Sequence, residues 1–322
     1  MNFKGTNSKI PLIVDYYNHF NEDLRLQRRH GQVEFNTNMH YILKYLGEDK
    51  SKKILDIGAG TGAYSIPLYE MGYNVCAIEL VEKNIERFKA NNPNVPVSQG
   101  NALDLSLFHD KSFDFILLFG PMYHLLKDSD KIKALAEAKR VLKDDGVIFV
   151  SYYMNDYAII NYGFMKGNIK QSLEEGRINK DFHIISLDDD LYSMVRIADI
   201  KSFDLECGMI SELMFASDGP SDYIRPILNR LSEEEFKIFL EYNLTICENQ
   251  ELLGASSHVV DIIRKKLWGI NFTALILIFT ILWSTWIWNN ITDIIYPCKV
   301  HNKSFKSHSK SRMDISTISS SI

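Results

Sequence analysis

The sequence has little cysteine and no C-x-x-C pair. Four of its 322 residues are cysteine, and none lies at a His-rich spacing typical of a metal site. We therefore expect neither a disulfide scaffold nor a bound metal. The first residues also lack the apolar core of a signal peptide, so the sequence predicts a reducing cytoplasm as the compartment.

The main part of the chain lacks an excess of positive charge. The net charge is −5, and the residues after Leu267 contain five Lys/Arg and two Asp, which leaves −8 for the rest. An acidic body has no basic surface for phosphate contacts, so a nucleic-acid partner is not expected. The hydrophobic content of 46% at this length is enough for a full core.

From residue 53 onwards, short apolar runs alternate with longer amphipathic stretches. This pattern is typical of a parallel α/β sheet with helices on both faces. The expected strands are 54–57, 75–79, 95–98, 113–119, 147–153, 210–216 and 258–263, and the expected helices include 61–71, 82–91 and 129–143. Gly146 is expected to supply a left-handed cap to the last of these helices. Ser232 and Glu235 have the spacing of a capping box at the start of a later helix.

The sequence predicts four parts of the chain, of which the first two end at residue 266. Residues 1–50 are predicted to form an N-terminal helical lid segment, and residues 51–266 one domain with an insertion at about 156–209. The helical period within 11–47 gives these candidate buried residues: Tyr16, Tyr17, Phe20, Met39, Tyr41, Ile42 and Leu46. Arg28, Arg29 and His30 are interpreted either as a lid over an anionic acceptor or as a solvated basic turn.

A long uncharged stretch follows residue 266. Residues 267–292 contain no Asp, Glu, Lys, Arg or His, and about 20 apolar residues are enough to span a bilayer. We therefore expect a membrane-anchoring helix at 267–290, with the basic residues 264–266 keeping the catalytic side in the cytoplasm. The alternative is a tail acquired by fusion or a shifted reading frame. Residues 291–322 are rich in Ser and Lys and are predicted to be disordered.

A glycine loop follows the first expected strand. Gly58, Ala59, Gly60 and Gly62 stand between that strand and a helix, where backbone N–H groups can face a ligand. Asp56 lies two residues before the first glycine, so its carboxylate would repel a pyrophosphate and attract the amino group of a cationic ligand. The loop therefore favours an aminoacyl sulfonium. The alternative is that the glycines serve only the steric needs of a tight turn.

Polar residues also follow the next two expected strands. Glu79 and Leu80 end the second strand, where a carboxylate can accept both hydroxyls of a ribose. Asn101 and Ala102 follow the third strand, where the Asn101 oxygen could bind an adenine amine and Ala102 would leave room for the ring. Each position also has a plain interpretation, as an exposed strand-end acid or a turn. All three strands end at the sheet edge where such folds bind ligands.

These motifs closely resemble those of the class I S-adenosylmethionine (SAM)-dependent methyltransferases. The stretch 54–62 is similar to their first motif, and Glu79 is similar to their ribose-binding acid. Residues 100–102 resemble their adenine segment. Residues 113–116 resemble their fourth strand, and residues 138–146 resemble the approach to their fifth strand. The resemblance covers about residues 40–155. It implies SAM as cofactor and a Rossmann-like, seven-stranded, mostly parallel sheet with an antiparallel last strand. Asn101 departs from the family, in which many members carry Asp.

The loop after the fourth strand holds the candidate catalytic residues. Methyl transfer is an in-line displacement that needs alignment rather than a nucleophile. His124 is the candidate base if the acceptor must lose a proton, Tyr123 is expected to pack on cofactor or acceptor, and Gly120 is placed at the cofactor. The alternative is that these aromatic residues only cover the sheet edge.

The function predicted from the sequence is methylation of a small-molecule acceptor, as in bacterial small-molecule-type members of the family. The segment 119–123 lacks the first polar residue and second proline of the enzymes that methylate base amines. Two alternatives remain open, a non-catalytic SAM-binding regulatory module and a nicotinamide oxidoreductase. The sequence does not determine the acceptor or the oligomeric state.

Overall fold

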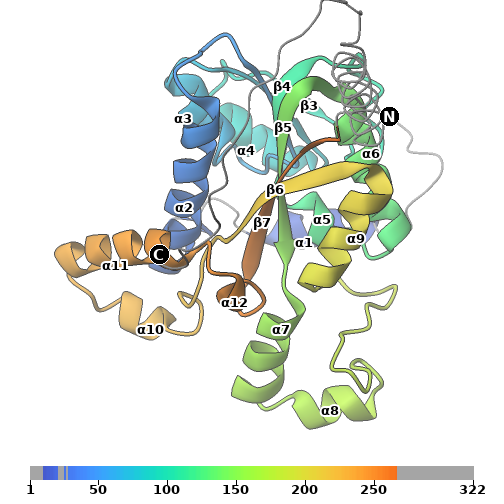
Figure 1. The fold of residues 1–322 in the computed structure, drawn as a ribbon, viewed down its shortest axis with the longest axis vertical. Helices are drawn as coiled ribbons and strands as arrows, with labels where there is room; N and C mark the ends of the chain where they lie inside the picture. The colour runs from blue at the N-terminus through green and yellow to red at the C-terminus, as the bar shows by residue number, and fades with distance from the viewer. Residues whose placement is uncertain (1–9, 21–24, 27, 267–322) are drawn as a thin grey trace, which may run out of the picture. The chain divides into compact units, whose positions relative to one another are not determined.

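The computed structural model describes residues 10–20, 25, 26 and 28–266, which form one sheet with helices on both faces (Figure 1). The strands are β1 (Lys53–Ile57), β2 (Asn74–Glu79), β3 (Val97–Gln99), β4 (Phe113–Leu118), β5 (Leu142–Tyr153), β6 (Met209–Ala216) and β7 (His258–Lys265). The helices are α1 (Ile10–His19), α2 (Arg29–Leu46), α3 (Ser65–Glu70), α4 (Glu82–Asn91), α5 (Pro121–His124), α6 (Asp128–Val141), α7 (Asn155–Ala158), the π-helical η2 (Ile159–Met165), α8 (Ile169–Glu174), α9 (Ile197–Cys207), α10 (Arg225–Leu228), α11 (Glu233–Ile246) and α12 (Gln250–Leu253).

The sheet has the order β3-β2-β1-β4-β5-β7-β6. Strands β1 to β5 pair in parallel, and β7 runs antiparallel to both of its neighbours, β5 and β6. The predicted Rossmann-like sheet with an antiparallel last strand is confirmed. The strand order reverses between β1 and β4, and open α/β sheets bind ligands beyond the carboxyl ends of the strands at such a point.

Strand β4 shows how the sheet divides two cores. Phe115 and Leu117 pack with residues of α2, α3 and α4, whereas Ile116 and Leu118 pack with residues of α6 and α9. Successive side chains point to opposite faces of a strand, and all four are at most 1% exposed. A stretch of strand that is buried on both faces needs no polar residues, which is why residues 115–118 of β4 form an apolar run in the sequence.

The expected cap at Gly146 is wrong. Helix α6 ends at Val141, and Leu142 begins β5 directly with an extended backbone (φ −72°, ψ 140°). Gly146 lies inside β5, where a Cβ would stand 2.6 Å from Cδ1 of Leu142 and 2.9 Å from the backbone oxygen of Asp114. Close packing against β4, rather than helix termination, therefore explains the glycine.

Of the other local predictions, one is confirmed and two hold only in part. The capping box of α11 is confirmed, since the Ser232 N–H donates to Glu235 Oε2 at 2.7 Å and the Glu235 N–H donates to Ser232 Oγ at 3.2 Å. Helix α3 starts only at Ser65, because the residues expected to open it form the glycine turn. In the N-terminal segment, the four candidates on α2 are buried, whereas Tyr16, Tyr17 and Phe20 are only half-buried.

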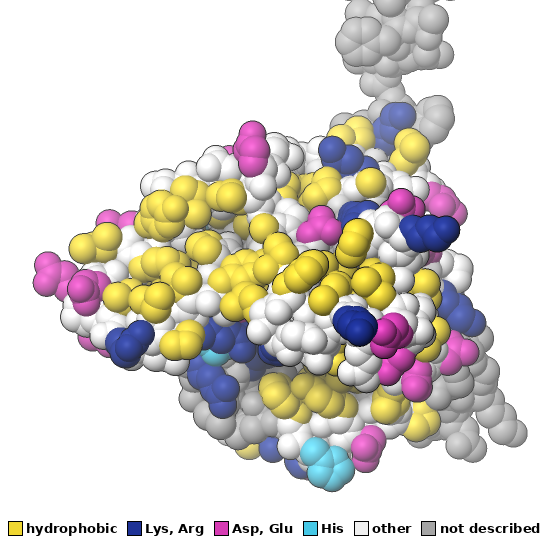
Figure 2. Space-filling view, turned by 90° about the horizontal axis from the view of Figure 1, so that it is seen from below, with side chains coloured by type: hydrophobic (Ala, Val, Ile, Leu, Met, Phe, Trp, Pro, Cys, Tyr) yellow, Lys and Arg dark blue, Asp and Glu magenta, His cyan; other side chains and the backbone are white. Residues whose placement is uncertain are grey.

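The segment between β5 and β6 carries exposed apolar side chains. It contains α7, η2, α8 and α9, and α7, η2 and α8 lie at the lower end of Figure 1. The view from below in Figure 2 shows apolar side chains spread over much of this face. Four of the exposed large ones belong to η2: Ile160, Tyr162, Phe164 and Met165. These side chains do not contribute to the core of the sheet.

Within the described ranges, we find no helix with the length and apolar character that a membrane crossing requires. The predicted anchor at 267–290 and the predicted tail at 291–322 lie outside those ranges.

Candidate functional site

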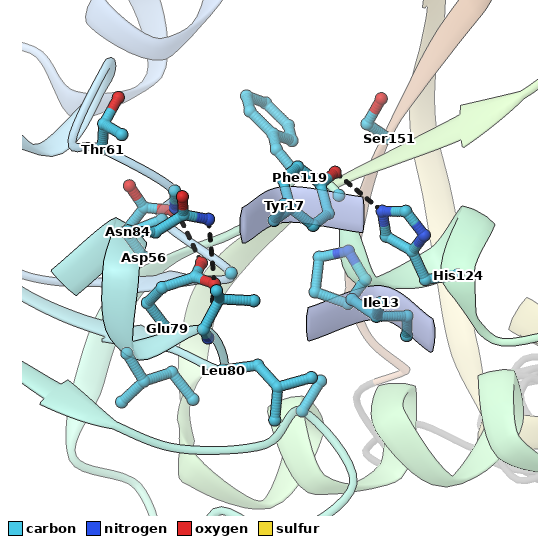
Figure 3. A pocket seen from close by; sticks show the side chains of 18 of the residues that line it. Ile13, Tyr17, Asp56, Thr61, Glu79, Leu80, Asn84, Phe119, His124 and Ser151 are labelled. Atoms are coloured by element: carbon cyan, nitrogen blue, oxygen red, sulfur yellow. Dashed lines mark hydrogen bonds between the residues drawn. The ribbon is translucent and has the colours of Figure 1, made fainter. Parts of the chain in front are cut away.

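The carboxyl ends of β1, β2 and β4 open into one pocket beneath α1. The pocket brings together all sequence-predicted site residues except Gly62: Asp56, Gly58, Ala59, Gly60, Glu79, Leu80, Asn101, Ala102, Gly120, Tyr123 and His124. Figure 3 shows Ile13 and Tyr17 of α1 on the side of the pocket opposite Asp56 and Glu79. We call this the cofactor pocket.

The three glycines of the loop have different structural roles. Gly58 has φ +76°, and a Cβ there would stand 2.7 Å from the Pro121 ring. Gly60 also has positive φ and donates its N–H to Glu79 Oε2 at 2.8 Å. Gly62 has φ +93° and packs on Ile66 and Phe88 rather than lining the pocket. The steric interpretation therefore holds for Gly62, while the first two glycines bring backbone to the pocket wall.

Asp56 is a buried carboxyl group at the end of β1. It is 2% exposed and accepts a hydrogen bond from Ser65 Oγ at 2.6 Å. Burial raises the pKa of Asp56 to about 7, and the charge of Glu79 adds to the rise, whereas the Ser65 hydrogen bond opposes it. Near neutral pH the group is therefore partly protonated, and a cation in the pocket would favour its carboxylate form.

Glu79 is held by donors from the glycine loop and from the start of α4. Its carboxylate accepts the N–H groups of Gly60 and of Val81 (2.9 Å), and the side-chain amide of Asn84 lies 3.4 Å away (Figure 3). These bonds set the orientation of the carboxylate at the pocket wall. Asn84 was not predicted from the sequence. Its place in the first turn of the helix that follows Glu79 was the available signal.

Asn101 closes its own turn. Its Oδ1 accepts the N–H of Leu103 at 3.0 Å, as expected for an Asn in a turn without a ligand. The residue still lines the cofactor pocket beside Ala102, and an amide oxygen has a second lone pair. The adenine assignment of Asn101 and Ala102 stays a prediction.

His124 is buried and hydrogen-bonded at both ring nitrogens. Nδ1 lies 3.0 Å from the backbone oxygen of Leu191, which can only accept, so Nδ1 carries the hydrogen. Nε2 then accepts the hydroxyl of Tyr17 at 2.9 Å (Figure 3). Burial lowers the pKa of His124 to about 4. The ring is therefore neutral at pH 7, and its basic nitrogen is engaged by α1.

A second, more polar pocket adjoins the cofactor pocket. The two share Tyr17, Arg25, Glu34 and Tyr123. The remaining lining residues of the second pocket are Phe20, His30, Gly31, Tyr153, Tyr192, Asp218, Asp222, Arg225, Ser257 and His258. This pocket was not predicted from the sequence, because its residues come from separate parts of the chain.

The basic turn of the N-terminal segment is divided by the fold. Arg29 donates to the backbone oxygen of Leu231 at 2.8 Å and pairs with Glu233 at 2.5 Å, so it joins α2 to the start of α11. His30 lines the second pocket. Arg25, which the sequence analysis did not single out, is the arginine of this region that lines both pockets.

Comparison with known proteins agrees with this geometry. Residues 55–150 match the family model described as a methyltransferase domain. A glycine/sarcosine N-methyltransferase from Aphanothece halophytica is 29% identical over 129 residues, which are 38% of this chain and 48% of that protein. A ubiquinone biosynthesis O-methyltransferase from Pelagibacter ubique is 33% identical over 104 residues, 32% of this chain and 42% of that protein. The chain thus spans less than half the length of these curated relatives.

A solved structure shows the same fold. It is a SAM-dependent methyltransferase from Thermotoga maritima, which aligns with a TM-score of 0.50 and 20% sequence identity. The alignment covers 80% of this chain and 98% of that structure.

Proposed function

We propose that this chain, a member of the class I SAM-dependent methyltransferases over residues 55–150, transfers a methyl group from SAM to a small-molecule acceptor. The observation that carries the proposal is the pairing of Asp56 and Glu79 in one pocket. The buried Asp56 suits the ammonium of the methionine part, and the fixed Glu79 carboxylate suits the ribose hydroxyls. A diphosphate at the glycine loop would meet the Asp56 carboxylate, which disfavours the nicotinamide alternative.

In this proposal the residues of the cofactor pocket promote the reaction by aligning SAM with the acceptor. SAM supplies an electrophilic methyl group on a sulfonium when it is bound. Asp56 and Glu79 would hold the two ends of the cofactor, and Tyr17 and Tyr123 lie on the side shared with the second pocket. Orienting an acceptor for in-line attack supplies several kcal/mol, about 7 or more in well-aligned systems, without a protein nucleophile. A second pocket joined to the first favours an enzyme over a non-catalytic SAM-binding module.

The direct test is ligand binding by calorimetry. We expect SAM and its demethylated product to bind and NAD not to bind. Because the Asp56 carboxyl must be ionised to pair with the ammonium, SAM affinity should fall about tenfold for each pH unit below about 7. Asp56→Asn should bind weakly and lose this pH dependence. Binding of NAD without SAM would refute the proposal.

We propose that the Tyr17–His124 hydrogen bond positions α1 over the reacting groups. His124→Ala and Tyr17→Phe should each lower kcat about tenfold while SAM affinity changes less than about twofold, since a buried hydrogen bond costs about 1–3 kcal/mol to break. Tyr162→Phe, at an exposed tyrosine, is the control. Because the pKa of His124 is about 4, neither variant should change the pH profile of kcat above pH 5. Loss of an inflection near neutral pH in His124→Ala would show instead that His124 is the base.

The acceptor cannot be taken from the relatives, because one is an N-methyltransferase and another an O-methyltransferase. For the compartment, we propose the reducing cytoplasm, which suits the free thiols of Cys76, Cys207 and Cys247 in the described part of the chain.

We also propose that residues 267–290 anchor the chain to a membrane, on the evidence of their uncharged sequence. The full chain should sediment with membranes and resist carbonate extraction, whereas a chain ending at Lys266 should stay in the supernatant and bind SAM equally well. Full-length monomer in the supernatant without detergent would contradict anchoring.

A further inference from the structure

We propose that the second pocket is the acceptor site, that its substrates are small aliphatic amines, and that His258 removes the proton from the amine before methyl transfer. The inference rests on the proposed function and specifies the substrate class of that site. We call this pocket the acceptor chamber.

The position of the chamber fits an acceptor. Tyr17 and Tyr123 line both the chamber and the cofactor pocket, so a substrate in the chamber would lie against the same two side chains as the methyl donor. The Tyr123 ring lies 5.9 Å from the His258 ring and 5.0 Å from the His124 ring. Proximity of this kind is the main requirement of an in-line displacement.

The acceptor atoms of the chamber suit an ammonium group. Glu34, Asp218 and His258 each place one acceptor or ligand atom within 4.8 Å of the others, and both carboxylates are at least 93% buried. A protonated amine offers only N–H donors, which suits the two buried carboxylates, while the third member of the group, His258, donates its Nδ1–H to Asp218. An anionic acceptor would face the same two buried carboxylates at a large desolvation cost.

The aromatic rings of the chamber and the pairing of its arginines with carboxylates also favour a cationic substrate. Five rings line the chamber and can attract a cation through their faces: Tyr17, Phe20, Tyr123, Tyr153 and Tyr192. Both arginines of the chamber already have carboxylate partners. Arg25 donates to Glu34 Oε2 at 2.7 Å, and Arg225 forms a two-point contact with Asp222 at 2.9 and 2.8 Å. The Arg25 charge beside Glu34 also disfavours a divalent metal at the Glu34–Asp218–His258 group.

His258 has the arrangement of a general base. Its Nδ1 lies 2.9 Å from Asp218 Oδ2, and the other oxygen of Asp218 accepts Ser256 Oγ at 2.5 Å and the His258 N–H at 3.0 Å. The fixed carboxylate can only accept, so Nδ1 carries the hydrogen and Nε2 is left as the atom that can take a proton. His124 lacks this property because Tyr17 occupies its Nε2.

The charged surroundings of His258 keep it basic. Burial lowers its pKa, but the carboxylates of Glu34 from α2 and Asp218 after β6 raise it further than burial and Arg25 lower it, so the net shift is upward. Tyr123 from α5 and Tyr153 from β5 lie against its ring. The other titratable and charged groups that line the chamber are Tyr17, His30, Tyr192, Asp222 and Arg225.

The proposed step is balanced in protons and electrons. An ammonium substrate gives one proton to Nε2 of His258, which frees the nitrogen lone pair. That pair forms the new N–C bond while the C–S bond breaks and its electrons stay on sulfur. The products are the N-methylated ammonium ion and S-adenosylhomocysteine, and the proton on His258 passes to water.

The test measures S-adenosylhomocysteine formed from SAM with two panels of compounds. One panel contains amino acids, ethanolamine, histamine and short diamines, and the other contains phenols, aliphatic alcohols, thiols and carboxylic acids. We expect turnover with at least one amine, unaffected by EDTA, and none with the second panel. Turnover only with the second panel, turnover abolished by EDTA, or no turnover with either panel while SAM binds would overturn the proposal. Failure of SAM to bind would instead contradict the proposed function.

A matched pair of histidine variants tests the base. Asn can donate to Asp218 as Nδ1 does but cannot take a proton, so His258→Asn should lower kcat with the best amine at least about tenfold and remove the inflection of kcat between about pH 6 and 8. SAM affinity should stay within about twofold. His19→Asn, at an exposed histidine of α1, should match the wild type. An unchanged pH profile in His258→Asn would overturn its role. If that variant is unfolded by circular dichroism, His258→Gln provides the same readout.

Discussion

Glu79→Ala is expected to bind SAM about 30- to 1000-fold more weakly than the unaltered chain. The carboxylate is the proposed partner of both ribose hydroxyls, and two lost charge-assisted hydrogen bonds cost about 2–4 kcal/mol. The variant also removes the acceptor of the Gly60 and Val81 N–H groups, so the glycine loop loses the contact that joins it to the end of β2. Titration calorimetry of the folded variant gives the comparison.

Two further variants make this result specific. Glu86→Ala removes an exposed carboxylate from α4 and should leave SAM affinity unchanged. Glu79→Gln keeps one acceptor oxygen and should fall between the alanine variant and the wild type. If Glu79→Ala is folded and binds SAM normally, the ribose assignment is wrong, whatever the activity of the chain.

Asp261→Asn is expected to raise the melting temperature, with the largest rise at alkaline pH. Asp261 of β7 is fully buried and Asp204 of α9 is 4% exposed, and each faces the other beneath the sheet. Burial and the neighbouring carboxylate raise the pKa of Asp261, and burial raises that of Asp204. The pair therefore holds a proton in the folded state at a pH where both carboxyls would be ionised in the unfolded chain.

The sign of the pH dependence follows from that proton. A folded-state pKa above the unfolded value of about 3.9 means that stability declines as pH rises from there toward the raised pKa. Asn at 261 cannot ionise, can still accept from Ser211 Oγ, and can donate to Asp204. We expect a gain of about 2 kcal/mol at pH 9, or about 4–8 °C, that shrinks toward pH 5. Asp188→Asn, at an exposed position, is the control. A gain that does not depend on pH would contradict the shared proton.

Much of the fold could be predicted from the sequence because it follows from local patterns. The apolar run of β4 reflects burial on both faces of a parallel strand, and the Ser232–Glu235 box marks the start of α11. The glycine loop and Glu79 lie at the ends of neighbouring strands, so the topology alone brings them to one edge. The prediction at Gly146 was wrong because the glycine is needed where β5 packs closely against β4, and that contact is not a local feature of the sequence.

Only the tertiary structure decided which side chains meet around the second pocket. Tyr17 and His124 are 107 residues apart, and the Tyr17 hydroxyl donates to Nε2 of His124. Burial keeps this ring neutral at pH 7. His124 is the residue that the sequence predicted as the base. Glu34, Asp218 and His258 converge from α2, the end of β6 and the start of β7. The sequence by itself determined most of the lining of the cofactor pocket, because strand ends and tight turns follow short-range backbone rules. The lining of the second pocket depends on how distant elements pack, and no spacing along the chain records that packing.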